Sequence, residues 1–178
     1  MEHIISVNGK TPVLGENCFL AQNSLVIGDV KAGRSCSFWF NVVVRGDVHS
    51  IEMGDLVNIQ DGAIIHCTYK KAPTKIGNRV SIGHNAIVHG CTLEDDVLVG
   101  MGAVVMDHAV IGKGAVIAAG SVVLQNTKVE PGSIYAGVPA KKVKATGPEH
   151  EDLIQRTAYN YVKYASWFDK GIELEDKD

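Results

Sequence analysis

The stretch LEDDVLVGMGAVVMDHAVIGKGAVIAAGSVVLQNTKV, residues 93–129, decides the fold of this chain. An aliphatic residue stands at every sixth place in it, from Leu93 to Val129. A period of six fits neither the 3.6-residue period of a helix nor the alternation of an ordinary strand. It fits a coil of six-residue units, each a short strand and a corner, in which the recurring residue points inward. Three units then close a triangular coil, and successive coils stack as parallel strands about 4.8 Å apart.

The same register runs through most of the chain. Its earlier inward positions, here called slots, are Leu14, Leu20, Val26, Ala32, Phe38, Val44, Met53, Ile59, Ile65, Ile76, Ile82 and Val88, and the last slot is Tyr135. A small or β-branched residue usually stands four places after a slot, and a glycine often follows the slot directly, which indicates tight corners. We therefore predict an all-β solenoid, a parallel β-helix of hexapeptide repeats, over residues 1–145.

The end of the chain follows a different period. Beyond Pro148 apolar residues recur at steps of four and three, at Ile154, Ala158, Tyr161, Ala165 and Phe168. This spacing predicts one amphipathic helix over residues 149–169, with Gly171 as its stop signal. Residues 146–178 are thus expected to form a C-terminal helix and tail.

Composition narrows the class of protein. The net charge is −3 and there is no basic block, which argues against nucleic acid as a partner. No apolar run approaches the roughly 18 residues of a membrane span, so no membrane is expected either. The four cysteines form no CxxC pair, and the first residues lack the pattern of a signal peptide. We therefore expect a cytoplasmic protein with reduced thiols.

Two histidines are brought together by counting units. His66 follows slot 65 and His89 follows slot 88, and only the slots at Ile76 and Ile82 lie between them. The first and fourth units of such a run share a face, one coil apart. His66 and His89 should therefore stack with both side chains pointing outward, where they could bind one Zn²⁺ at about 2.0–2.1 Å.

A third histidine, His84, stands two places after slot 82, on the preceding face and near a corner. Outward side chains on two faces of a triangle diverge, so a neighbouring subunit is better placed than the same chain to supply it. This predicts a metal shared across an interface in a closed ring. Three neutral imidazoles leave one coordination position open, as in catalytic zinc sites. The alternative is a polar cluster on the surface.

Polar residues flank the first break in the register. Arg45 and Asp47 precede it, and Asn58, Gln60 and Asp61 follow it. Gln60 follows slot 59, which places it on the face of His84, one coil earlier. An ion pair of Arg45 with Asp47 or Asp61 is either an exposed bridge that contributes little or a contact that orients groups beside the metal.

These residues resemble the γ-class carbonic anhydrases. The motifs that carry the resemblance are Arg45-Gly-Asp47, Asn58-Ile-Gln60-Asp61-Gly, His66, and Ile82-Gly-His84 through His89-Gly, within a match over residues 10–145. The resemblance implies a left-handed β-helix and a homotrimer with one metal at each interface. It assigns His66 and His89 to one chain and His84 to the next.

The resemblance also assigns roles around the metal, at Arg45, Asp47, Asp61, Asn58, Gln60 and Tyr135. It implies that Arg45 and either Asp47 or Asp61 form an interface salt bridge. It further implies that Gln60 orients the metal-bound water, that Asn58 holds Gln60, and that Tyr135 lies near the site.

The activity that follows is reversible hydration of carbon dioxide to bicarbonate by a zinc-bound hydroxide, because a cation held by three histidines lowers the pKa of bound water to about 7. Fe²⁺ or Co²⁺ would suit the same imidazole ligands. Two departures from the family pattern predict weak activity. Val48 replaces a glutamate, and the loop 67–75 has no carboxylate to export protons. Asp61, Glu52, His49 or buffer would have to substitute.

Two other functions stay open. The first is an acyl-CoA thioesterase or acyltransferase on the same scaffold, since the Gly-Val-Pro-Ala-Lys segment at 137–141 resembles those enzymes as well. The second is a catalytically weak trimeric assembly subunit whose metal is structural or vestigial.

Overall fold

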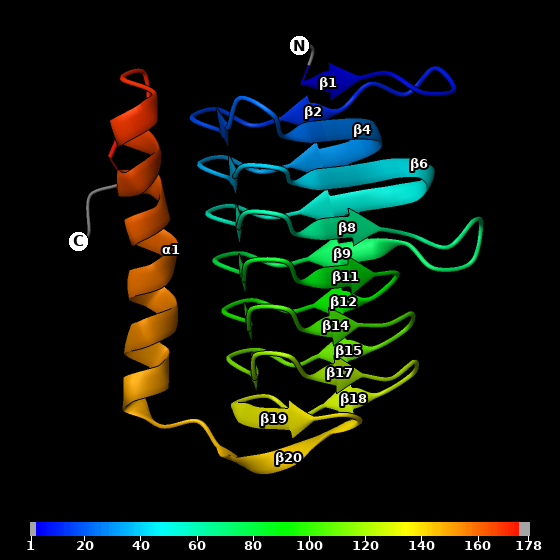
Figure 1. Cartoon of the computed structure of the whole chain (residues 1–178), viewed down its shortest axis with the longest axis vertical. Coiled ribbons are helices and arrows are strands. Elements are labelled where there is room, and N and C mark those ends of the chain that lie inside the picture. The colour runs from blue at the N-terminus through cyan, green and yellow to red at the C-terminus, as the bar shows by residue number, and fades with distance from the viewer. Residues whose placement is uncertain (1–2, 175–178) are drawn as a thin grey trace.

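The computed structural model describes residues 3–174. The chain forms a left-handed parallel β-solenoid of about seven turns, with a single C-terminal helix lying along it (Figure 1). The predicted fold class is confirmed. No helix among residues 3–174 is long and apolar enough to cross a membrane.

The strands are short, and most have two or three residues. In chain order they are β1 (Ile4–Ile5), β2 (Val13–Leu14), β3 (Phe19–Leu20), β4 (Leu25–Ala32), β5 (Ser37–Phe38), β6 (Val43–Met53), β7 (Asn58–Ile59), β8 (Ile64–His66), β9 (Thr74–Ile76), β10 (Ser81–Ile82), β11 (Ile87–His89), β12 (Thr92–Leu93), β13 (Leu98–Val99), β14 (Val104–Val105), β15 (Val110–Ile111), β16 (Val116–Ile117), β17 (Val122–Val123), β18 (Lys128–Val129), β19 (Ser133–Gly137) and β20 (Ala140–Ala145). The helix α1 spans Pro148–Phe168.

Parallel pairing between the strands of successive coils divides the solenoid into three faces. The helix face is formed by β3, β5, β7, β10, β13, β16 and β19. The histidine face is formed by the first part of β6 with β8, β11, β14 and β17. The polar face is formed by the last part of β6 with β9, β12, β15 and β18. Three units per turn is therefore the observed geometry.

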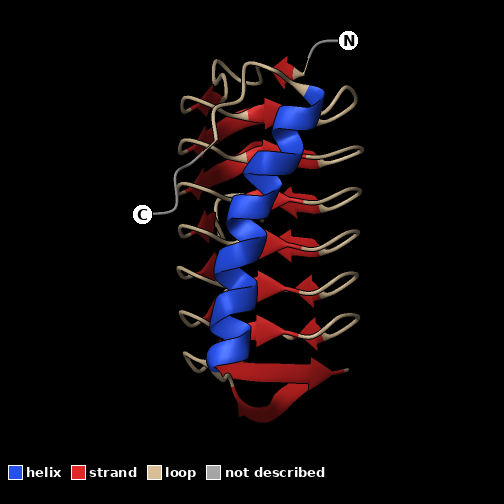
Figure 2. Ribbon diagram, turned by 90° about the vertical axis from the view of Figure 1, so that its left-hand side faces the viewer, coloured by secondary structure: helices blue, strands red, loops and turns tan. Residues whose placement is uncertain are grey.

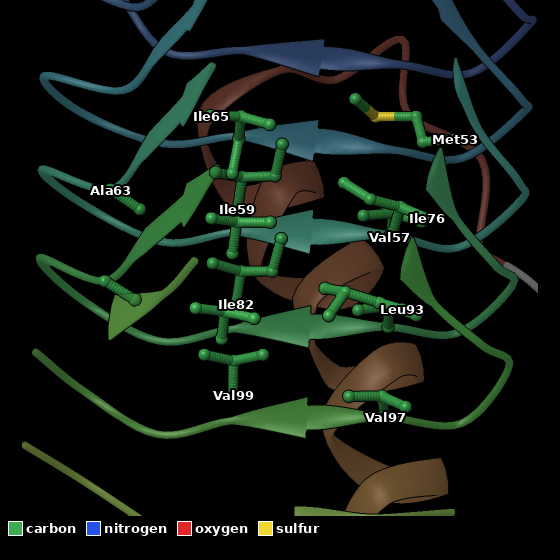
Figure 3. Close-up of a cluster of buried hydrophobic side chains, with 14 of the residues drawn as sticks. Met53, Val57, Ile59, Ala63, Ile65, Ile76, Ile82, Leu93, Val97 and Val99 are labelled. Atoms are coloured by element: carbon green, nitrogen blue, oxygen red, sulfur yellow. The ribbon is translucent and has the colours of Figure 1, made fainter. Parts of the chain in front are cut away.

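The slots form the core. Ile59, Ile82 and Val99 lie in register on successive coils and are at most 1% exposed, as Figure 3 shows for part of the column. Burying each such side chain fully is worth about 1.5–3 kcal/mol, so the ladder of aliphatic slots stabilises the stack.

The residues that form the tight corners are not the glycines directly after the slots, which the sequence analysis takes as the sign of a corner. The residue three places after a slot adopts the left-handed conformation, for example Asn85 with φ 57° and Asn126 with φ 62°. The glycines directly after slots serve another purpose. A Cβ at Gly83 would lie 2.7 Å from the Met101 nitrogen on the next coil, so glycine is required there by close stacking.

The two long interruptions of the register also have structural causes. The eleven residues of β6 run through a corner, pairing with β8 at one end and with β9 at the other. The second interruption, predicted at 67–75, is a loop over residues 67–73 that projects from the stack between β8 and β9 (Figure 1). Neither interruption disturbs the stacking of the coils that follow.

The C-terminal part matches the prediction with two corrections. β19 and β20 form an antiparallel hairpin that the sequence analysis missed. The helix ends at Phe168, with Asp169 as its C-cap, so Gly171 is not the stop signal. The helix crosses the helix face (Figure 2), burying Ile154, Ala158, Val162 and Ala165.

Candidate functional site

The site is centred on two stacked histidines. His66 ends β8 and His89 ends β11, and the two residues are direct partners in the parallel ladder. The Nδ1 atom of His66 lies 3.1 Å from the Nε2 atom of His89, and the ring centroids are 5.1 Å apart. The predicted stacking of this pair is confirmed.

The second nitrogen of His66 is held by a carboxylate. Its Nε2 atom lies 3.1 Å from Oδ1 of Asp47, and the other oxygen of Asp47 accepts a hydrogen bond of 2.6 Å from Arg45. Arg45 and Asp47 therefore pair within one chain and orient His66. That this contact orients groups beside a metal stays a prediction.

The second nitrogen of His89 is held in the same manner by a residue that the sequence analysis missed. Oδ1 of Asp107 lies 2.5 Å from Nδ1 of His89, and Oδ2 accepts a hydrogen bond of 2.6 Å from Thr68. Asp107 stands eighteen residues after His89, which is one coil. The counting that paired the histidines could therefore have found it.

His84 lies apart from this pair within the chain. It follows β10 at the corner between the helix face and the histidine face, and its Nδ1 atom lies 2.8 Å from Asp61 on the preceding coil. Asp61 thus contacts His84 here and not Arg45. Within residues 3–174 of one chain, no three His, Cys, Asp or Glu side chains are grouped to hold a metal ion.

The predicted Asn58 and Gln60 contact is present. The amide nitrogen of Gln60 donates to Oδ1 of Asn58 at 3.0 Å, and Asn58 in turn donates to Ser81 at 2.7 Å. Both side chains are buried. Since β7 pairs with β10, Gln60 lies beside the corner that carries His84.

Other predicted residues lie elsewhere. Tyr135 occupies the last inward slot, paired with Ile117 and 9% exposed, so within one chain it is not brought together with the histidines. Its assignment to the site stays a prediction. Glu52 lies opposite Lys75 in the parallel strand ladder of the polar face. The ring of His49 accepts a hydrogen bond from the backbone nitrogen of Ser50.

The nitrogen geometry fits a metal. Two ligands at 2.0–2.1 Å from zinc with a tetrahedral angle lie about 3.3 Å apart, close to the 3.1 Å between the two facing ring nitrogens. Each of the three histidines has one nitrogen against an aspartate, the arrangement by which proteins orient metal-binding imidazoles. His66, His89 and, from another subunit, His84 are the residues that would hold it.

The electrostatics favour neutral imidazole beside charged carboxylate. Burial lowers the pKa of His66 despite its hydrogen bond to Asp47. Burial alone would raise the pKa of Asp47, but hydrogen bonds from Arg45 and His66 bring it below the usual value. For Asp107, hydrogen bonds from Thr68 and His89 outweigh burial in the same direction. A neutral histidine is the form that binds a metal.

Acid is expected to destabilise the metal-free protein in two stages. The pKa of His66 is lower in the native state than in the unfolded state, so the unfolded protein binds its proton at a higher pH. The free energy of unfolding therefore decreases as pH falls below about 6.5. The lowered pKa values of Asp47 and Asp107 add stability above about pH 3.9 that disappears as pH falls through their native values. Urea unfolding with a chelator present, repeated across pH 7 to 3, measures this. Asp107→Asn should reduce only the lower stage, to which Asp47 still contributes, and a protein that gains stability between pH 7 and 5 would contradict the assignment.

Comparison with known proteins agrees with this architecture. The model for "Bacterial transferase hexapeptide (six repeats)" matches residues 90–125, and that for "Hexapeptide repeat of succinyl-transferase" matches residues 73–106. A hexapeptide transferase family protein from Anaplasma phagocytophilum has a similar structure, with a TM-score of 0.90 at 38% identity, covering 94% of this chain and 98% of that one.

Among curated relatives, the "Probable carbonic anhydrase" of Methanocaldococcus jannaschii is 50% identical over 85% of this chain and 94% of its own length. "Protein YrdA" of Escherichia coli is 41% identical over 92% of this chain and 93% of its own. "Gamma carbonic anhydrase 2, mitochondrial" of Arabidopsis thaliana is 41% identical over 91% of this chain, which spans 60% of that longer protein. The chain belongs to the γ-carbonic anhydrase family of hexapeptide-repeat proteins.

Proposed function

We propose that this protein is a metal-dependent carbonic anhydrase that converts carbon dioxide reversibly to bicarbonate at the interfaces of a homotrimer. The observation that carries the proposal is the pair of facing nitrogens on His66 and His89, 3.1 Å apart, each ring held from behind by an aspartate. Zn²⁺ is the metal we propose, and Fe²⁺ or Co²⁺ would suit the same ligands.

An apolar surface supports the subunit interface. One outward column on the histidine face, here called the apolar wall, is aliphatic on six successive coils, at Leu25, Val43, Ile64, Ile87, Val104 and Val122. Ile64 and Ile87 are 42% and 36% exposed. The matching column on the polar face contains Glu52, Lys75, Thr92, Val110 and Lys128. An exposed apolar strip that borders the histidines is typical of a surface covered by a partner.

The corner that carries His84 is the surface we propose to pack on this wall. Met101 lies next to His84 on the following coil and is 59% exposed. Packing this corner of one subunit against the wall of the next would bring His84 of the partner subunit to His66 and His89. The same contact, repeated around a ring, would close a trimer with three equivalent sites.

The roles of the residues follow from their contacts. When bound, the metal supplies a Lewis acid that activates water near neutral pH. Because the amide nitrogen of Gln60 donates to Asn58, its amide oxygen is left to accept a hydrogen bond from the attacking water. Asp61 is the nearest carboxylate to the ring of His84 and is 39% exposed, so it is our choice for passing a proton to solvent.

Assays of two reactions separate this function from its alternative on the same scaffold. Purified, zinc-loaded protein should accelerate carbon dioxide hydration in a stopped-flow assay with a pH indicator. It should leave acetyl-CoA and succinyl-CoA uncleaved in a thiol-release assay. Similarity to hexapeptide transferases makes the second assay necessary. Thioester cleavage without carbon dioxide hydration would reverse the assignment, and a metal-loaded trimer without either activity would favour an assembly subunit.

The apolar wall predicts a charge-sensitive assembly. Ile87→Lys places a charge on the wall beside His89 and should convert the trimer to monomers at micromolar concentration, as measured by analytical ultracentrifugation. Val110→Lys is the matched control, because Val110 lies on the polar face between Thr92 and Lys128. If Val110→Lys dissociates the protein and Ile87→Lys does not, the interface lies on the other face.

A further inference from the structure

Both carboxylate oxygens of Asp107 have hydrogen-bond partners beside the pair of stacked histidines. Oδ1 lies 2.5 Å from Nδ1 of His89, and Oδ2 accepts from Thr68 at 2.6 Å. Among residues 3–174, no arginine or lysine lies within ion-pair distance of Asp107, whereas Asp47 also pairs with Arg45. Apart from the Thr68 hydroxyl, the His89 imidazole is therefore the hydrogen-bond partner that holds this carboxylate.

The backbone leaves room for this carboxylate. Gly90, directly after His89, has φ 54°, and a Cβ there would lie 2.5 Å from Oδ1 of Asp107. The nitrogen of His108 donates to the Gly90 carbonyl at 2.7 Å, which ties the two corners together. A side chain at position 90 would push the carboxylate away from His89.

The loop 67–73 and the first residue of β9, Thr74, complete the arrangement. Thr68 holds Asp107, and Thr74 near the other end donates to the His66 carbonyl at 2.6 Å and accepts from the Gly90 nitrogen at 3.0 Å. The loop that interrupts the repeat is thus fastened to both histidine strands. It lacks carboxylates of its own, but it holds the one supplied by the next coil.

We propose that Asp107 is a positioning residue of the metal centre, held in turn by Thr68. It keeps His89 in the tautomer with hydrogen on Nδ1, so that Nε2 presents its lone pair toward the nitrogen of His66. This inference deepens the proposed function and rests on it. Outer carboxylates of this kind typically affect metal affinity 10–100-fold.

The first experiment measures metal release from zinc-loaded protein with a chromogenic chelator. Asp107→Ala should release zinc about 10–100-fold faster than the unmodified protein. Thr68→Val, which keeps the shape of the side chain but removes the hydroxyl, should have a smaller effect in the same direction, and Thr68→Ser should restore slow release. Asp152→Asn is the control, because Asp152 pairs with Arg156 on the exposed surface of α1.

The second experiment reads the tautomer without any metal. In ¹⁵N-labelled, metal-free protein, the His89 ring should carry its hydrogen on Nδ1, and Asp107→Ala should shift it toward Nε2. Unchanged tautomer and unchanged zinc release in both the Asp107 and Thr68 variants would overturn the positioning role while leaving the proposed function intact. If the protein binds none of Zn²⁺, Fe²⁺ and Co²⁺, the proposed function fails, and the tautomer measurement still decides whether Asp107 positions His89.

Discussion

Replacing His89 with alanine is expected to remove the metal and to lower carbon dioxide hydration to the background rate, a fall of about a thousandfold or more. In the proposed site His89 supplies one of three imidazole nitrogens, and without it only His66 and His84 of the partner subunit would remain to hold the zinc. The readouts are metal per subunit by mass spectrometry of the elements and the stopped-flow rate.

The fold should tolerate this change. His89 points outward from β11 while the neighbouring slot Val88 carries the core packing, so alanine removes no buried slot. His150→Gln is the matched control, since His150 lies at the start of α1, away from the site. Full metal content in His89→Ala would refute the proposed ligands. Full metal content with lost activity would instead assign His89 a role other than binding.

Much of the site was predictable because one rule of counting fixes the positions of its residues. Slots at 65 and 88 must share a face if three units make a turn, and the ladder pairs His66 with His89 as that rule requires. The same rule places Gln60 one coil from the strand of His84. Short-range propensity played little part, because most of the strands are only two or three residues long.

The sequence analysis missed two features on the outer surface of the solenoid, the contact of Asp107 with His89 and the apolar wall. Asp107 was missed because attention was given to histidines, although its spacing from His89 is one full coil. The apolar wall was missed because only inward residues were counted. Ile64 and Ile87 are exposed on the outer surface of the single chain, where the proposed partner subunit would cover them.

Mixing two inactive variants provides the sharpest expected result for the shared site. His84→Ala retains the pair His66 and His89, whereas His89→Ala retains His84. Neither protein alone should bind the metal. When the two are denatured together in equal amounts and refolded, about a quarter of the interfaces should combine the intact pair of one subunit with the intact His84 of the partner subunit. About a quarter of the metal content and activity of the unmodified protein should return.

The physical reason is the divergence of side chains around a corner. His84 lies on the helix-face side of its corner and contacts Asp61 of its own chain, while His66 and His89 face outward from the adjoining face. A centre completed within one chain would gain nothing from mixing. Native mass spectrometry must therefore first establish that mixed trimers form. Mixed trimers that bind no metal, beside an unmodified protein that does, would show that each chain builds its site alone.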